Sequence, residues 1–197
     1  MKSFKRYLTE STEENNGTSI QPKTKKELRD ILKERLEKDP NADLNDIDVS
    51  NITDMSELFC QLNPNNIDVS KWDVSNVEDM SFMFYGCDKF NSDLSAWDVS
   101  KVKDMSDMFS CCENFNSDLS KWDVSNLQNM TCMFSFCKKF KSDLSKWHAP
   151  NLHWSPDAFL FSKMSKLPDW YEEIENKLLA SPPEFMKKFI KNIKKIN

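Results

Sequence analysis

The side chains that could do chemistry in this chain recur with a fixed spacing of 25 residues. They flank a repeated tryptophan and comprise Lys71, Asp73, Asp98, Lys121, Asp123, Lys146 and His148. A series of aspartates could hold calcium, but calcium ligands usually come from one compact loop with a glycine at its sharp turn. The chain has only Gly17 and Gly86. No P-loop, zinc-binding cysteine pair or catalytic triad is visible, so the sequence predicts a protein that is not an enzyme and holds no metal or cofactor.

Two interpretations of these flanking residues are open at the level of sequence. The aspartates could accept hydrogen bonds from backbone N–H groups in the Asp-Val-Ser turns, which would offset the repulsion between stacked like charges. Alternatively, the flanking residues recognise a protein partner on the concave side of a narrow parallel sheet. His148 takes the place of an aspartate in the last unit, where no serine or cysteine nucleophile can be placed beside it.

The elements that position these side chains belong to one internal repeat, which runs from residue 48 to residue 159 without an insertion or deletion. In one unit, Leu94, Trp97 and Val99 have the spacing of a short strand. The next apolar residues stand at i, i+3, i+4 and i+7, which predicts a two-turn helix. They are Met105, Met108, Phe109 and Cys112. Asp104 precedes this stripe, where its carboxylate would act as the helix N-cap.

One such unit cannot bury its own apolar residues, so neighbouring units must stack. Stacking would place like residues on like and build ladders of tryptophan, methionine and phenylalanine. We interpret these ladders as the core rather than as a cofactor pocket. Cys87, Cys112 and Cys137 fall inside the apolar pattern, which predicts buried thiols rather than disulfides or zinc ligands.

The pattern of the units resembles that of a known family. Residues 97–120 read W-D-V-S-x-V-x-x-M-x-x-M-F-x-x-C-x-x-F-N-x-D-L-S. This resembles the BspA-type leucine-rich repeats, which occur in bacterial surface proteins and lipoproteins and in phage-encoded proteins. Members of that family are implicated in binding proteins and surfaces. The resemblance implies an α/β fold class, with a short leucine-rich-repeat-like solenoid of strand-turn-short helix coils and helical caps at both ends.

The ends of the repeat are expected to be covered by helices, because an open stack needs capping. We expect five segments: a targeting or processing peptide (1–10), a flexible linker (11–22), an N-terminal helical cap (23–42), the repeat solenoid (43–162) and a C-terminal helical cap (163–197). The first cap contains a helix with the apolar stripe Leu28, Ile31, Leu32 and Leu36. A last helix is predicted to begin after Ser181. Either its apolar face docks on the final coil and its lysines face solvent, or the helix is offered to a partner, an anionic membrane or nucleic acid.

The first ten residues resemble the capsid-targeting peptides of internal head proteins in large tailed phages. In those peptides a prohead protease cuts after a glutamate in an L-x-E context, and Leu8, Thr9 and Glu10 form the matching processing motif. The alternative is an ordinary N-terminal tail. No secretory signal, lipidation motif or long apolar run is visible. We therefore expect the protein in the host cytoplasm, or in the virion if the peptide targets it to the phage head.

The leading functional hypothesis is a non-catalytic protein-binding repeat scaffold, phage-encoded and packaged in the head or acting on a host protein. The alternatives are a bacterial surface or adhesion protein of the BspA type and a purely structural internal head protein. The net charge is −5, and residues 41–100 carry twelve acidic against two basic groups, which argues against a nucleic-acid-binding face there. We expect no small-molecule substrate, and contact with nucleic acid or membrane only through the basic C-terminal helix.

Overall fold

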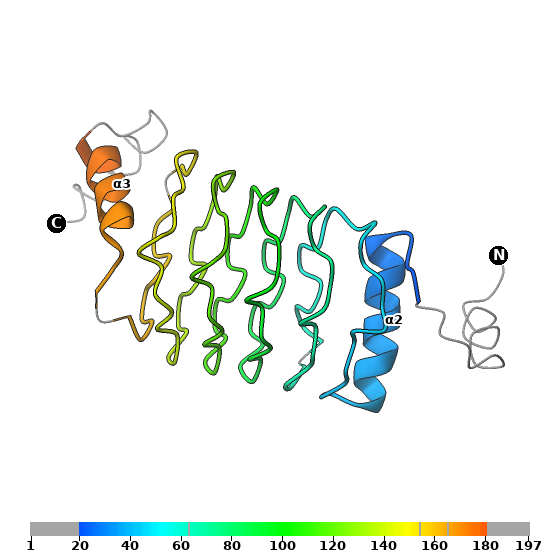
Figure 1. The fold of residues 1–197 in the computed structure, drawn as a ribbon. Coiled ribbons are helices and arrows are strands. Elements are labelled where there is room, and N and C mark those ends of the chain that lie inside the picture. The colour runs from blue at the N-terminus through cyan, green and yellow to red at the C-terminus, as the bar shows by residue number, and fades with distance from the viewer. Residues whose placement is uncertain (1–19, 63, 154, 165, 181–197) are drawn as a thin grey trace, which may run out of the picture.

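Figure 1 shows a stack of coils with one helix at each end. The computed structural model describes residues 20–62, 64–153, 155–164 and 166–180, without the side chains of residues 178 and 179. The predicted processing peptide, most of the predicted linker and the predicted helix after Ser181 lie outside the described residues. Within the described part there are two helices, α2 (Lys25–Lys38) and α3 (Asp169–Ala180). Neither of these two is both long and apolar enough to cross a membrane.

Helix α2 forms where the sequence predicts it. Thr24 is its N-cap, and the side chain of Thr24 accepts a hydrogen bond from the N–H of Glu27 at 3.1 Å. Such a bond satisfies one of the first-turn donors that have no partner inside the helix. The predicted apolar stripe is buried and joins the core: Leu28, Ile31, Leu32 and Leu36. The helix prediction for this segment is confirmed.

Arg29 of α2 completes the hydrogen bonding at the first coil. Its guanidinium donates to the carbonyl oxygens of Glu57, Leu58 and Cys60, and the bonds to Leu58 and Cys60 are both 2.8 Å long. Within the stack, carbonyls equivalent to those of Leu58 and Cys60 accept an N–H from the preceding coil, as Met83 O does from Phe59 N and Ser110 O does from Gly86 N, both at 2.9 Å. A guanidinium presents several N–H donors in one plane, so it can take the place of the coil that is missing at this end.

The predicted α/β fold class is wrong, and the coils are not those of a leucine-rich-repeat solenoid. Residues 94–99 do not extend into a strand, because the N–H of Trp97 folds back to Leu94 O at 3.1 Å. Across the described ranges the structure has no strand, only isolated parallel bridges such as Asp79↔Asp104. The predicted short helix with Met105 and Cys112 is wrong as well, since this segment consists of successive turns.

The hydrogen bonds of residues 105–112 explain why no helix forms there. Every second amide, from Met105, Asp107, Phe109 and Cys111, donates to the next coil at 2.8 to 3.0 Å. Between them, Met108 N closes an i→i+3 turn onto Met105 O at 3.2 Å, and Ser110 N closes one onto Asp107 O at 3.1 Å. Ser106 N donates to the side chain of Asp104 at 2.8 Å. A helix would need each amide for its own i−4 carbonyl. Asp107 and Cys111 also have positive φ values of 53° and 64°, which suit the third residue of a type II turn and exclude a right-handed helix.

The side-chain ladders form the core as expected. The indole of Trp97 donates to Val69 O at 3.1 Å, and the indole of Trp122 donates to Leu94 O at 2.9 Å. Phe109 has no exposed surface, and its ring stacks at 5.7 Å on the ring of Phe84 in the coil before. The buried thiols are free and belong to Cys87, Cys112 and Cys137. The core interpretation of the repeated apolar residues is confirmed.

Helix α3 lies on the last coil through two aromatic side chains. The indole of Trp170 donates to Leu144 O at 2.8 Å, and its ring stacks at 6.2 Å on Trp147. Tyr171 is almost fully buried, and its hydroxyl donates to Ser155 O at 2.8 Å. Trp170 thus adds one more step to the tryptophan ladder from a segment outside the repeat pattern.

Candidate functional site

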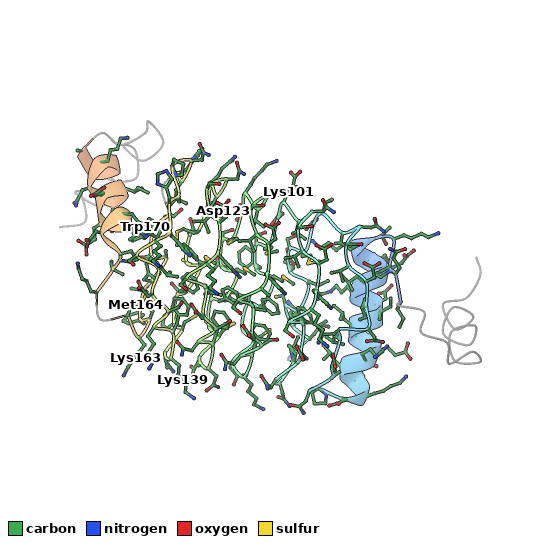
Figure 2. The ribbon with its side chains drawn as sticks, in the orientation of Figure 1. Lys101, Asp123, Lys139, Lys163, Met164 and Trp170 are labelled. Atoms are coloured by element: carbon green, nitrogen blue, oxygen red, sulfur yellow. The ribbon has the colours of Figure 1, made fainter. Side chains whose placement is uncertain are left out.

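The residues predicted to bind a protein partner all lie on the surface of the coils. They are Lys71, Asp73, Asp98, Lys121, Asp123, Lys146 and His148, and each is exposed. Figure 2 places Asp123 toward the same edge of the stack as Lys101. No sheet lies beneath them, so the narrow concave sheet expected from the sequence is absent from the described coils. Their role in recognition stays a prediction.

The aspartates of this set make hydrogen bonds within their own coils. The carboxylates of Asp73, Asp98 and Asp123 accept the backbone N–H two residues later, at 3.1, 3.0 and 2.9 Å. Such bonds close Asx turns, in which a side chain replaces a backbone acceptor. A second aspartate series makes the same bond at 2.9 Å in each coil: Asp68, Asp93, Asp118 and Asp143. The hydrogen-bonding interpretation of the aspartates is confirmed.

The same hydrogen bonds lower the pKa of two of these carboxyl groups, those of Asp98 and Asp123. Hydrogen bonds from Ser100 lower the pKa of Asp98 below its ordinary value. Those from Ser125 lower the pKa of Asp123, although the nearby charge of Asp98 acts in the opposite direction. A carboxyl group with a lowered pKa does not hold a proton near neutral pH. These aspartates are therefore acceptors that shape the turns, and they are poorly suited to act as proton donors.

A second surface feature is a set of large apolar side chains on the turn segment that replaces the predicted helix. We call it the exposed apolar surface, and it consists of Phe82, Tyr85, Phe136, Leu160 and Phe161. The rings of Phe136 and Phe161 lie 5.0 Å apart in neighbouring coils, and Phe161 is 66% exposed. Three of these residues, Phe82, Phe136 and Phe161, have positive φ values of 56°, 60° and 56°. That conformation is uncommon for any residue with a bulky side chain.

A third feature is a hollow of about 640 Å³ that crosses several coils, which we call the lysine–asparagine groove. Its ammonium groups come from Lys89, Lys138, Lys139, Lys141 and Lys163. Its amides come from Asn66, Asn91, Asn114 and Asn116. Figure 2 places Lys139 and Lys163 at the edge of the stack opposite the one that carries Lys101 and Asp123. The turn of Asp123 and the groove therefore lie toward different edges of the stack.

The described residues offer little material for metal or thiol chemistry. Among them, no three histidine, cysteine or acidic side chains are grouped so that they could hold a metal ion. Burial raises the pKa of Cys87 to about 12 and also raises the pKa of Cys112, so these thiols are poor nucleophiles. His153 contacts only a nearby backbone oxygen, that of Asn151 at 2.8 Å, among the contacts resolved for its ring.

The family described as "Mycoplasma protein of unknown function, DUF285" matches residues 27–147. The chain belongs to this family. The DUF285 family is related to the BspA-like repeat proteins, so the match agrees with the resemblance of the repeat units to that group. No curated protein and no solved structure matches the chain. The matched segment of this DUF285 protein includes Phe82, Tyr85, Phe136 and most of the groove.

Sequence reasoning missed both the exposed apolar surface and the groove. A usable signal was present in the positions of the repeat that change character from coil to coil. One such position reads Asp88, Glu113, Lys138 and Lys163 in successive coils, which turns from acidic to basic along the stack. The exposed aromatic residues were missed for another reason. A helix prediction does not single out Phe136, whereas the turns observed in the structure leave its side chain exposed.

Proposed function

We propose that this DUF285 protein is a non-catalytic scaffold that binds a protein partner through the exposed apolar surface. The observation that carries the proposal is the combination of exposure and backbone conformation at Phe82, Phe136 and Phe161. A left-handed conformation costs an ordinary residue roughly 1 kcal/mol or more. An aromatic ring that stays exposed to water adds no hydrophobic stabilisation to offset this cost. Contact with another protein would bury these rings and supply it.

The other positions of the same column support this argument. Where Phe136 and Phe161 stand, the earlier coils have Gln61, Gly86 and Cys111, so the turn itself does not require an aromatic residue. Aromatic residues are also enriched at the centres of protein–protein interfaces, because they bury much area with few rotatable bonds. The Phe136–Phe161 pair is therefore the expected centre of the contact.

Site-specific photo-crosslinking in the native cell tests this proposal. A photoreactive residue at position 161 is expected to trap a defined protein, whereas one at position 101, which is exposed but not part of this surface, is the control. The double substitution Phe136→Ser and Phe161→Ser should abolish the cross-link formed from position 82 and leave the unfolding free energy nearly unchanged. Recovery of the same protein from the double variant, or of no protein from position 161, would contradict the proposal.

The setting in which the scaffold works is part of the same proposal. Leu8, Thr9 and Glu10 support a phage-encoded protein packaged in the head, and the BspA-type pattern of residues 97–120 supports either that origin or a bacterial surface protein. A purely structural head protein is the remaining alternative. The intact mass of the native protein separates these settings. A chain that begins at Ser11 supports prohead processing, and a chain that begins at Met1 or Lys2 counts against it.

A further inference from the structure

The lysine–asparagine groove is lined almost entirely by hydrogen-bond donors. The side-chain oxygen of Asn91 accepts the backbone N–H of Asn116 at 2.8 Å, and the side-chain oxygen of Asn116 accepts the backbone N–H of Lys141 at 2.9 Å. These bonds fix the orientation of both amides, because their oxygens are committed to the next coil. The NH₂ groups of Asn91 and Asn116 donate to no residue that the structure describes. These NH₂ groups are therefore free to donate hydrogen bonds to a ligand.

The ammonium groups of the groove are largely uncommitted as well. Lys138 pairs with Glu113 at 2.6 Å. Lys89, Lys139, Lys141 and Lys163 form no salt bridge with any residue in the described ranges. Lys141 also lines two adjoining hollows, one toward α3 and one toward Asp118 and Asp143. Four ammonium groups that line one hollow without a salt bridge raise the local positive potential, which attracts an anionic ligand.

The shape and the surroundings of the groove select among anions. The groove runs from Asn66 in the first coil to Lys163 in the fifth, which is roughly 20 Å at the spacing of parallel chains and matches about six extended residues. Acidic groups stand close by: Asp88 shares a column with Lys138, and Asp118 and Asp143 border the adjoining hollow. A continuous phosphate backbone would meet these carboxylates. A peptide can place its own carboxylates only where the lysines lie.

Base stacking gives a further reason to prefer a peptide over a nucleic acid. Single-stranded nucleic acids are usually held on exposed aromatic rings. The aromatic residues behind this groove, Phe90, Phe115 and Phe140, have no exposed surface. A polypeptide, in contrast, supplies a backbone carbonyl at every residue in addition to its carboxylates, and both are acceptors for the NH₂ and ammonium groups of the groove.

We infer that the lysine–asparagine groove binds a short, extended, acidic peptide segment. This inference rests on the proposed function only in taking the partner to be a protein, and it concerns a different surface. Carboxylates of the peptide pair with Lys139, Lys141 and Lys163, and its backbone carbonyls accept from Asn91 and Asn116. The acidic segment belongs to the protein partner.

Fluorescence anisotropy of the full-length protein with a labelled peptide of about eight glutamates tests this inference. The wild-type chain should bind this peptide, and the affinity should fall as salt is raised. The double variant Lys139→Glu and Lys141→Glu should bind at least about tenfold more weakly, because like charges then face each other. The control Lys101→Glu and Lys103→Glu makes the same change in net charge at positions outside the groove and should change the affinity less than about twofold.

Three results would overturn the inference: no binding of the glutamate peptide, equal losses in the two double variants, or tighter binding of an oligothymidylate that is lost in the same groove variant. The last result would assign the groove to nucleic acid. Urea unfolding of each variant checks that the coils are intact. Since the assay uses a purified probe and not the cellular partner, its failure leaves the photo-crosslinking test of the exposed apolar surface untouched.

Discussion

The aspartate turns and the lysine–asparagine groove follow the same 25-residue step, yet their side chains are used in opposite ways. Asp98 and Asp123 each accept a backbone N–H from their own coil, at 3.0 and 2.9 Å. Lys139 and Lys141 contact no acidic partner among the described residues and line an open hollow. The aspartates stabilise turns of the fold, whereas the lysines remain available to a ligand.

This difference shows how function can be located inside a repeat. A column that holds the same residue in coil after coil, as with Asp73, Asp98 and Asp123, meets the same backbone need each time. A column that changes from coil to coil, such as the one containing Glu113 and Lys138, has no common backbone duty. Strict internal repetition therefore indicates structure, and departures from it point to surfaces that bind.

The largest expected effect is on stability at the aspartate turns. The double substitution Asp98→Ala and Asp123→Ala should lower the unfolding free energy by about 2 kcal/mol, since each lost side-chain acceptor leaves a backbone N–H unpaired and costs about 1 kcal/mol. Urea unfolding measures this. The matched pair Lys139→Ala and Lys141→Ala should shift the same quantity by less than about 0.5 kcal/mol. An equal loss of unfolding free energy in both pairs would mean that the lysines support the fold as much as the aspartates do, which would contradict their different roles.

A smaller effect is expected where the turns need a left-handed residue. Gly86 has a φ of 73°, and no atom lies within 4 Å of the place where a Cβ would stand. Gly86→Ala should therefore lower the unfolding free energy by about 1 kcal/mol through backbone strain alone. Cys111→Gly, at the same position one coil later, should raise it by a similar amount. If both substitutions shift stability in the same direction, the turn geometry assigned to this column is incorrect.

The smallest effect is a dependence of stability on pH. Hydrogen bonds lower the pKa of Asp93, Asp98 and Asp123 in the folded chain. A lowered folded-state pKa means that the stabilisation is present above the unfolded value near 3.8 and is lost as the pH falls through the folded pKa. Asp98→Asn with Asp123→Asn keeps an acceptor oxygen at each turn, so this variant should lose part of the acid sensitivity while staying folded.

Urea titrations on either side of that pH measure the difference between the two proteins. The pair Lys139→Ala and Lys141→Ala should keep the full acid sensitivity of the wild type. An unchanged pH profile in the asparagine variant would mean that the hydrogen-bonded aspartates contribute nothing to acid stability.

Much of the core could be predicted from the sequence, because burial follows the repeat whatever the backbone does. Met105, Met108, Phe109 and Cys112 are all fully buried, as an apolar stripe should be. The helix assigned to them was wrong because the i, i+3, i+4, i+7 spacing is equally satisfied by linked turns. Two features distinguish the turns from a helix: the positive φ of Asp107 and Cys111, and the hydrogen bonds that alternate amides donate to the next coil. The spacing of apolar residues contains no information about either feature.

The prediction of a strand at residues 94–99 was wrong for a related reason. Leu94, Trp97 and Val99 are spaced as in leucine-rich repeats, but the Asx turns of Asp93 and Asp98 bend the chain before and after Trp97. The Asp-Val-Ser sequence suggests the turn at Asp98 but not the one at Asp93, and a strand would leave room for neither. The groove was missed because it is formed by residues of five coils, from Asn66 to Lys163. The column that changes from Asp88 to Lys163 is a signal for it, but only when the coils are considered as a stack.

Hydrogen exchange of the full-length protein, with and without the glutamate peptide, tests the central contrast most directly. We expect the peptide to slow exchange at residues 88–91, 113–116 and 138–141, where the groove lies, and to leave exchange at residues 98–101 and 123–126 unchanged. Protection concentrated at the aspartate turns, or spread evenly over both edges, would contradict the assignment of one edge to the fold and the other to a partner.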